Sequence, residues 1–508
     1  MNPAMPSPLK PEALTNPDTQ DSLLAMTVVD SLRIGADAGG SLAVLGQSDT
    51  TVREMVDLAE ARGRGLVQAG LEPGNHVAVC LPTSVDLVIW AWAIAFAGGS
   101  AVLVSSRAGE VELRKYAAFS KARWIITDRT GDGFTNPDEA ARTFYTTAGV
   151  ELPAVTPDAE AMCFATSGST GSAKLAAFAN RTFPAQFISY HHMIGGGPGE
   201  TIVYPQPMAH IAYIPQVHFT LVQGRRLVAL PKFDAKAVIE AAADEHAAVI
   251  NGTPSMWGLI FDRVPLPDHR LALRRVNYAA APMPDRWAKK MIELMKCEVV
   301  HAYGLTEAGG VMTTLPPEKI IAKAGSAGSM IAPQQAMATI DPMGATLASG
   351  EVGEICFRTP AATIGYLGQP EQTDELFDGG WLHTGDLGYV DGDGDLWITG
   401  RLKEQISRGG LKIGAREVEI VIESIEGVTG VGVAGIPDPV LGERVGAVVE
   451  VSDQSISSEK IRLAVAAQLA DYKVPDRVIF VNELPRNLMA KTDKPAVRKI
   501  LEGHRDRD

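Results

Sequence analysis

The sequence predicts an α/β fold: a large amino-terminal body of doubly wound α/β layers with a β-rich subdomain, then a small α+β domain. Three features indicate this. From about residue 50, helical segments alternate with short apolar segments, which is typical of parallel sheets covered by helices. Around residues 336–400, short strands and Gly/Asp turns replace the alternation. After Gly400 the density of charged residues rises, and the remaining length suits a separate domain.

The first part of the body alternates most clearly. Helices are expected at 51–70 and 87–97, and strands at 77–81, 101–105 and 124–127. The stretch from Leu87 to Val104 is apolar and long enough for a marginal membrane span. The Gly98–Gly99 pair and the β-rich residues after it favour a buried helix followed by a buried strand.

The second part repeats this pattern and then changes. Strands are expected at 226–231, 248–251 and 276–279, and helices at 234–246 and 285–296. In the β-rich subdomain, strands are expected at 353–358, 388–390 and 396–399. The small domain is expected to hold an amphipathic helix at 415–424 and strands at 430–435 and 446–451.

These patterns divide the chain into three regions. Residues 1–24 carry five prolines within the first seventeen positions and lack the basic and apolar segments of a signal peptide. They are therefore expected to form a disordered tail. Residues 25–400 form the body and residues 401–508 the small domain, with the boundary at Gly400–Glu404.

The composition is that of a soluble globular protein. Of 508 residues, 46% are apolar and 21% charged. The 46 basic and 60 acidic residues give a net charge of −14, which argues against nucleic acid or an anionic membrane surface as a partner. The four cysteines are far apart, without metal-like spacing or a disulfide framework, which suits the reducing cytoplasm.

Three motifs resemble binding sites without meeting their requirements. Asp391–Asp395 begins like a calcium loop, but Leu396 and Leu402 stand where glycine and glutamate are needed, so a tight turn between strands is expected. Gly195–Gly199 lacks the strand and helix of a dinucleotide loop. His191–His192 has no third ligand at metal spacing and is expected to be a polar pair in a helix or loop.

Residues Thr166–Lys174 (TSGSTGSAK) hold five hydroxyls, two glycines and a lysine within nine positions. Glycines let the backbone approach phosphates closely, and hydroxyls, amides and an ammonium donate to phosphate oxygens. The stretch is not a Walker loop, because the Gly-Lys-Ser/Thr spacing is absent. By composition alone, a Ser/Gly-rich linker fits equally well.

Five further motifs follow in a fixed order: HAYGLTE at 301–307, WLHTGD at 381–386, GRLKE at 400–404, GGLKI at 409–413, and LPRN with AK at 484–491. Together with the loop at 166–174 they resemble the signatures of the acyl-adenylate-forming superfamily, in its acyl-CoA synthetase or acid–CoA ligase branch. The last motif matches less well than the others. The resemblance extends from about residue 50 to about residue 500.

The resemblance implies a reaction of ATP with a carboxylic acid in the presence of Mg²⁺, followed by transfer of the acyl group to CoA. The carboxylate attacks the α-phosphorus, giving an acyl-adenylate and pyrophosphate. Because two anions meet, catalysis depends on positioning and charge neutralisation. The implied catalytic residues are Lys491, His210, Thr306 and Glu307, and Glu307 is also the implied magnesium ligand.

The resemblance also implies which residues bind the nucleotide. The loop would hold the β- and γ-phosphates, Tyr303 would stack on adenine, and Asp386 would accept hydrogen bonds from the ribose. Arg401 would reach the ribose or the phosphates, and Thr306 the α-phosphate. The implied set is Thr166, Ser167, Gly168, Ser169, Thr170, Gly171, Lys174, Ala280, Ala281, Pro282, Ala302, Tyr303, Gly304, Thr306, Asp386 and Arg401.

Lys491 is implied to bridge the attacking carboxylate and the α-phosphate, where negative charge accumulates. Asn487 and Ala490 depart from the threonine and glycine that are usual in the family, and alanine restricts the loop backbone. The neighbouring Lys494 and Lys499 are expected to be surface charges.

Lys403 falls at the family's hinge position, which implies that the small domain is mobile. It would first deliver Lys491 and then present Gly409, Gly410 and Lys412 to the incoming thiol. A short link can absorb such a change through a few dihedral angles.

The acid is indicated by two adjacent residues. His210 matches a family position near the reacting carboxylate, although a packed histidine at a helix start is the alternative. Ile211 stands where amino-acid activators carry aspartate, and an unpaired ammonium there would be costly, so amino acids are disfavoured. The implied acyl pocket, formed by small and apolar residues that suit a sizeable hydrophobic acid, consists of His210, Ile211, Ala279, Ala280, Gly304 and Gly309.

Two alternatives stay open. The enzyme could stop at the adenylate or load the phosphopantetheine of a carrier protein, although the insertion that such ligases often carry before the hinge is not evident. The chain could also be a nucleotide-binding regulator without catalysis, against which Lys174, Glu307, Asp386 and Lys491 argue. The natural acid and the oligomeric state stay open, and a homodimer is compatible with the sequence.

Overall fold

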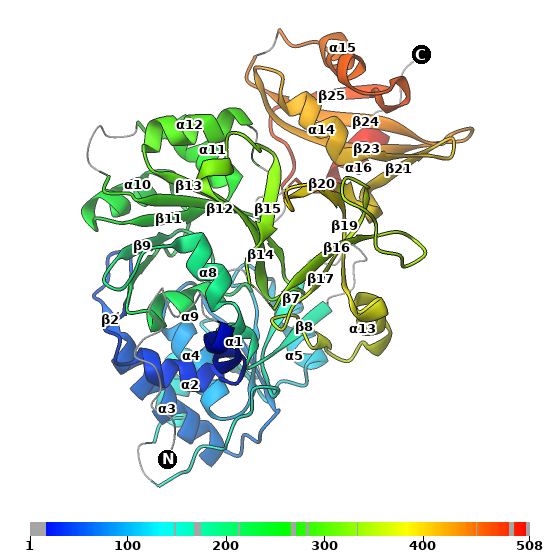
Figure 1. Ribbon diagram of the computed structural model, residues 1–508. Helices are drawn as coiled ribbons and strands as arrows, with labels where there is room; N and C mark the ends of the chain where they lie inside the picture. Colours follow the sequence, from blue (N-terminus) through cyan, green and yellow to red (C-terminus); the bar gives the residue numbers. More distant parts are fainter. Residues whose placement is uncertain are drawn as a thin grey trace.

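The computed structural model describes residues 17–146, 149–166, 174–211, 214–265, 271–280, 283, 285–332, 334–453, 455–486 and 492–503. Two large sheets form the body, and a third sheet forms a smaller unit that carries the carboxy-terminal part of the chain (Figure 1). The structure confirms the predicted α/β class.

The largest sheet has thirteen strands. Their order is β16 (Ala336–Ile340), β17 (Gly353–Arg358), β19 (Leu382–Val390), β20 (Leu396–Arg401), β15 (Ser326–Met330), β14 (Gly310–Leu315), β13 (Glu298–Leu305), β12 (Arg275–Ala279), β11 (Val249–Gly252), β9 (Thr201–Tyr204), β10 (Arg226–Ala229), β1 (Ser41–Val44) and β2 (Thr50–Thr51). From β1 to β13 the neighbours run parallel, so their carboxyl ends meet at one edge. From β13 to β16 they run antiparallel, which is the expected β-rich region.

The second sheet of the body has seven strands. Their order is β18 (Gly365–Tyr366), β8 (Lys174–Ala179), β7 (Glu160–Thr166), β4 (Ser100–Leu103), β3 (His76–Cys80), β5 (Trp124–Thr127) and β6 (Phe134–Thr135). The pairing of β18 with β8 joins residues that are far apart in sequence, because Tyr366 lies opposite Ala176.

The third sheet has five strands: β22 (Leu411–Gly414), β21 (Gln405–Arg408), β24 (Gly442–Val451), β23 (Val428–Asp438) and β25 (Arg477–Val481). The short 3-10 turn Leu402–Glu404 connects β20 of the body to β21 of this sheet. The chain therefore passes from the thirteen-stranded sheet to the five-stranded sheet through this one short turn.

The helices cover both faces of the body's sheets. They are α1 (Pro17–Leu24), α2 (Val28–Gly35), α3 (Val52–Gln68), α4 (Val85–Phe96), α5 (Glu110–Phe119), α6 (Pro137–Thr143), α7 (Thr182–Ala185), α8 (Phe187–Ile194), α9 (Ile214–Val222), α10 (Ala235–Asp244), α11 (Pro254–Arg263), α12 (Asp285–Met295) and α13 (Pro370–Leu376). The smaller unit adds α14 (Ala415–Glu423), α15 (Ser458–Gln468) and α16 (Lys494–Gly503). Apolar residues of α2, α4, α8 and α9 fill the space between the two large sheets, whereas α10, α11 and α12 cover the opposite face of the larger one.

Most expected elements are present with ends shifted by a few residues, and β5 and β17 coincide with their expected ranges. One expectation is wrong. Residues 17–24 form α1 rather than a disordered tail, because Leu23 is buried in the core and Asp21 accepts a hydrogen bond from Gln334. Residues 1–16 lie outside the described residues.

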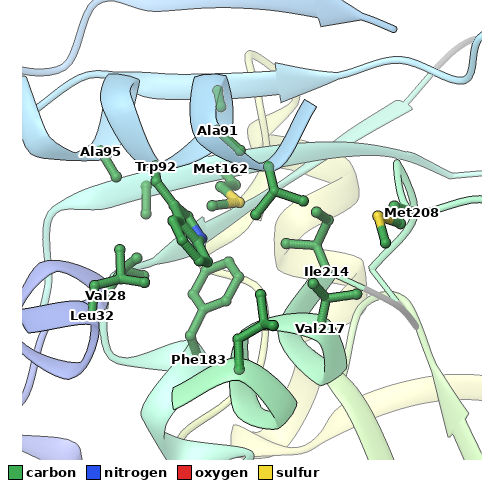
Figure 2. Packing of buried hydrophobic residues seen from close by; sticks show 14 of the residues in the cluster. Val28, Leu32, Ala91, Trp92, Ala95, Met162, Phe183, Met208, Ile214 and Val217 are labelled. Carbon is green, nitrogen blue, oxygen red and sulfur yellow. The ribbon is translucent and has the colours of Figure 1, made fainter. Parts of the chain in front are cut away.

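The apolar stretch around α4 is a core helix. Ser84 caps its start by accepting a hydrogen bond from the Leu87 amide, and residues 87–96 are all buried. Trp92 points toward Phe183, with Val28 of α2 on one side and Met162 of β7 on the other (Figure 2). Among the described residues, no helix is both long and apolar enough to cross a membrane.

We expect Trp92→Ala to destabilise the body strongly, because the indole is 1% exposed and lies between the two sheets. Large-to-small substitutions of this kind cost about 3–5 kcal/mol. The midpoint of urea unfolding measures the effect. Leu463→Ala is the control, since Leu463 is 64% exposed, and equal midpoints for the two variants would contradict the role of Trp92.

Candidate active site

The turn between β13 and β14 forms the centre of the candidate site. It begins at the carboxyl end of the parallel strands, which is where ligands bind in open α/β sheets. Gly304 is required here, because a Cβ atom at this position would lie 1.8 Å from the Gly310 carbonyl oxygen. The Gly309 amide donates to the Thr306 carbonyl at 2.9 Å and closes the turn. The close approach of the two strand ends presents Thr306 and Glu307 together.

Glu307 is held by the segment that contains β18. The Tyr366 hydroxyl donates to Glu307 Oε1 at 2.7 Å, and the Thr363 amide donates to the Glu307 carbonyl at 2.8 Å. Burial and the charge of Glu307 raise the pKa of Tyr366, so its hydroxyl stays protonated and donates. Lys174 Nζ lies 4.4 Å from the centre of the Tyr366 ring. Tyr366 therefore joins the anion of Glu307 to the cation of Lys174.

Lys174 closes the predicted phosphate loop. Thr166 and Lys174 are cross-strand partners in the antiparallel pair β7–β8, so the loop is the connection of a hairpin. The residues between them, 167–173, lie outside the described residues, and so the predictions for Ser167, Gly168, Ser169, Thr170 and Gly171 stay predictions. The structure does bring Lys174 close to the Glu307 turn, because both side chains contact Tyr366.

Asp386 forms the other end of the site. This carboxylate is 4% exposed, accepts a 2.6 Å hydrogen bond from the Tyr303 hydroxyl and makes a 2.7 Å ion pair with Arg401 Nε. Burial and the neighbouring charge of Asp386 raise the pKa of Tyr303 well above its ordinary value. The same carboxylate raises the pKa of Arg401. Since Asp386 and Arg401 are partners in the β19–β20 ladder, the sheet itself sets their contact.

Two residues that the sequence did not single out position this cluster. Tyr366 is one, as described above. Glu354 of β17 is the other: its Oε1 accepts a hydrogen bond from the Gly385 amide at 2.8 Å, and its Oε2 contacts His383 Nδ1 at 2.8 Å. Glu354 thereby fixes the backbone immediately before Asp386.

The predicted acyl-pocket residues lie at the same edge. Ile211 is buried, and Ala279 ends β12 opposite Ala302 of β13. Ala280 adopts φ 73°, a left-handed conformation that is rare for residues other than glycine. The predictions for Ala281 and Pro282 lie outside the described residues. His210 is half-buried, one residue before Ile211.

The predicted thiolation residues lie in the smaller sheet. Gly409 and Gly410 form a two-residue hairpin turn between β21 and β22, with φ of 56° and 86°. Lys412 is exposed beside this turn and donates to Ser407 Oγ at 3.4 Å. Lys403 is exposed in the short turn between the two sheets. Lys491 lies outside the described residues, and Lys494 is not a free surface charge, because it binds Glu419.

The rejected motifs are explained by their surroundings. Asp391–Asp395 forms a tight turn closed by a 2.9 Å hydrogen bond from the Asp391 amide to the Asp395 carbonyl. Lys323 bonds three carboxylates of this turn, so cationic side chains already balance the cluster. Gly195 ends α8, so Gly195–Gly199 follows a helix rather than a strand. Burial lowers the pKa of His191 to about 4, which agrees with a packed, neutral side chain.

Comparison with known proteins identifies the family. Residues 36–367 match the AMP-binding enzyme family, and residues 417–491 match its carboxy-terminal domain. The chain belongs to the AMP-binding enzymes. It is an acid–thiol ligase of the acyl-adenylate-forming superfamily, as the sequence motifs predicted.

Relatives of this enzyme share most of its length. It is 29% identical over 473 residues to the long-chain-fatty-acid–CoA ligase FadD13 of Mycobacterium tuberculosis, covering 88% of this chain and 92% of that one. It is 27% identical over 441 residues to a 2-succinylbenzoate–CoA ligase of Bacillus cereus, covering 86% and 90%. Among solved structures, the amide bond synthetase McbA of Marinactinospora thermotolerans aligns with a TM-score of 0.84 at 26% identity, covering 94% and 100%.

We expect Tyr366→Phe to lower the rate of pyrophosphate release from ATP about tenfold or more, because a hydrogen bond to a charged group contributes about 1.5–3 kcal/mol. The variant keeps the ring beside Lys174 and removes only the bond to Glu307. Steady-state kinetics at several Mg²⁺ concentrations measure the loss.

Tyr389→Phe is the matched control, because Tyr389 stacks on Trp397 in the β19–β20 strand pair and its hydroxyl has no hydrogen-bond partner among the described residues. Equal rates for the two variants would show that Tyr366 does not position Glu307.

Proposed function

We propose that this enzyme activates a hydrophobic carboxylic acid with ATP and transfers the acyl group to the thiol of CoA. One observation carries the proposal. A continuous chain of contacts runs from Lys174 through Tyr366 to Glu307, and from the same turn through Tyr303 to Asp386 and Arg401. These contacts put Lys174 and Asp386 on either side of one turn, which supports a role for Lys174 in phosphate binding and for Asp386 in ribose binding.

The first step joins two anions. A carboxylate oxygen of the acid attacks the α-phosphorus, the bond from this phosphorus to the bridging oxygen breaks, and pyrophosphate leaves with the electron pair. Lys174 holds the β- and γ-phosphates, Thr306 donates to the α-phosphate, and Asp386 fixes the ribose. Lys491 neutralises the charge that builds between the carboxylate and the phosphate.

The residues present fit a magnesium ion. Glu307 offers a hard carboxylate oxygen, and within the described residues its side chain is bonded by Tyr366 and by no cation. When bound, Mg²⁺ would neutralise phosphate charge at Glu307. No other side chain that the structure describes at this turn offers a carboxylate.

The second step needs a different surface. The thiol loses its proton to solvent, and the sulfur attacks the acyl carbonyl carbon. The bond from this carbon to the AMP oxygen breaks, and AMP leaves with the electron pair. Rotation of the smaller domain, residues 401–508, about Lys403 would replace Lys491 with the hairpin turn Gly409–Gly410 and its neighbour Lys412. The exposed, side-chain-free turn lets a pantetheine arm approach the backbone closely.

The nature of the acid follows from the pocket and from the relatives. Ile211 is buried and cannot pair with an ammonium, which disfavours amino acids. FadD13 and the 2-succinylbenzoate–CoA ligase are named for acids with large carbon bodies. Both observations support an acid with a sizeable apolar part.

One alternative has support of its own. McbA is named an amide bond synthetase, so a similar fold serves an acceptor other than CoA. An enzyme that stops at the adenylate, or that loads a carrier protein, would share the first step. Consumption of free CoA during turnover separates these acceptors.

The described cysteines are all free thiols, which supports the reducing cytoplasm as the location of the enzyme.

Lys491→Ala is expected to lower acid-dependent pyrophosphate release by a factor of hundreds or more, since losing one such donor costs about 3–4 kcal/mol. Exchange of labelled pyrophosphate into ATP, with a panel of aliphatic and aryl acids, measures the first step alone. Lys499→Ala is the control, because Lys499 is exposed on α16. Unchanged exchange in Lys491→Ala would remove this residue from the reaction.

Lys403→Pro is expected to slow thioester formation more than adenylation, because proline fixes one backbone angle at the hinge. The two half-reactions are measured separately, by pyrophosphate exchange and by acyl-CoA formation from preformed acyl-adenylate. A parallel loss in both would contradict a hinge at this position.

A further inference from the structure

A buried polar face lies on one side of α7 and α8. It consists of Thr182, Gln186, Ser189 and Tyr190. Gln186 follows Thr182 by four residues, and Ser189 and Tyr190 follow Gln186 by three and four, so the four share a side of the helical segment. Each of the four is 0% exposed. The Thr182, Ser189 and Tyr190 hydroxyls and both amide atoms of Gln186 find no hydrogen-bond partner among the residues that the structure describes.

This polar face lies against the catalytic turn. A Cβ atom on Gly310 would lie 2.6 Å from the Tyr190 hydroxyl and 3.4 Å from Gln186 Oε1. A Cβ atom on Gly309 would lie 3.2 Å from Thr182 Cγ2. Because both positions are glycine, the backbone of Gly309 and Gly310 contacts the polar face directly, with no side chain between them.

Packing alone does not account for these side chains. A buried donor or acceptor without a partner destabilises the fold, and native proteins leave few of them. The residues between them on the same helices, Phe183, Phe187 and Ile188, are apolar and fill the core between the two sheets. Polar atoms clustered on the one side that meets the turn are what a pocket needs to orient a ligand.

We propose that this polar face binds an uncharged hydrogen-bonding group of the acid, a hydroxyl or a carbonyl, remote from the carboxylate that reacts. The inference rests on the proposed function and narrows its substrate class to an apolar acid with one such group. Gln186 can donate and accept, and the Tyr190 phenol donates, so both kinds of group find a partner.

The face does not suit a second carboxylate. Its four side chains are neutral, and burial raises the pKa of Tyr190, so the phenol keeps its proton. His218 of the adjacent α9 contacts Phe183 and Phe187, and burial lowers its pKa to about 3, which leaves it uncharged at neutral pH. A buried anion would have no cation among these residues, and an unpaired buried charge is costly.

The test compares acids in matched pairs. Aliphatic and aryl acids are assayed beside counterparts of equal length that carry one hydroxyl or keto group far from the carboxylate, with pyrophosphate release as the readout. We expect a polar member to exceed its apolar partner in kcat/KM by at least tenfold, because a site built to bond a polar group discriminates against the analogue that lacks it.

Two variants address the residues themselves. Tyr190→Phe and Gln186→Leu are each expected to reduce the preference ratio about tenfold, since each removes one hydrogen bond to the ligand. Tyr116→Phe is the matched control, because it removes a buried phenol hydroxyl in the separate cluster that packs against α5, and it should keep the wild-type ratio. Thermal unfolding of every variant identifies loss of fold.

The outcomes separate the two proposals. If some acids release pyrophosphate but polar and apolar partners react equally, the inference is wrong and the proposed function stands. If the variants change thermal stability and leave the ratio unchanged, the face is structural and the inference is wrong. If no acid releases pyrophosphate, the proposed function fails and the inference fails with it.

Discussion

The close approach of Gly304 and Gly310 is the constraint on which the candidate site depends. A side chain at Gly304 would collide with the Gly310 carbonyl, so the strands β13 and β14 can meet only through glycine. Their meeting sets the turn that presents Thr306 and Glu307, and it places Tyr303 within hydrogen-bond distance of Asp386. It also lays Gly309 and Gly310 directly against α7 and α8.

Tyr366 shows how the two large sheets share one site. It belongs to the seven-stranded sheet through its pairing with β8, yet its hydroxyl reaches Glu307 beside the thirteen-stranded sheet. The hydrogen bond from Tyr366 to Glu307 therefore connects the two large sheets. A displacement of either sheet would change the distance between Lys174 and Glu307, and the core around Trp92 packs between these two sheets.

Local sequence patterns predicted the helices and strands, but they did not predict side-chain contacts between residues far apart in the sequence. The strand at 124–127 was recognisable because apolar residues end abruptly at polar ones. The hairpin turn at Gly409–Gly410 was not predicted, although adjacent glycines suit a turn with positive φ at both positions. Tyr366 and Glu354 gave no such signal, since their partners lie 59 and 31 residues away. The polar side chains from Thr182 to Tyr190 were hidden among aromatic and apolar neighbours, and only the packing against Gly310 gives their spacing a meaning.

The ladder that pairs Asp386 with Arg401 has a mechanical consequence. Arg401 stands two residues before Lys403, so the guanidinium that pairs with Asp386 lies immediately before the turn at which the chain leaves the body. Rotation of the smaller unit would therefore put strain on the ion pair between Arg401 and Asp386. By reciprocal linkage, a bound nucleotide that strengthens the Asp386–Arg401 ion pair would oppose rotation of the smaller unit. A rotation that weakens this ion pair would in turn speed dissociation of the nucleotide. Under the proposed function, the strand that holds Arg401 would couple movement of the smaller unit to AMP release.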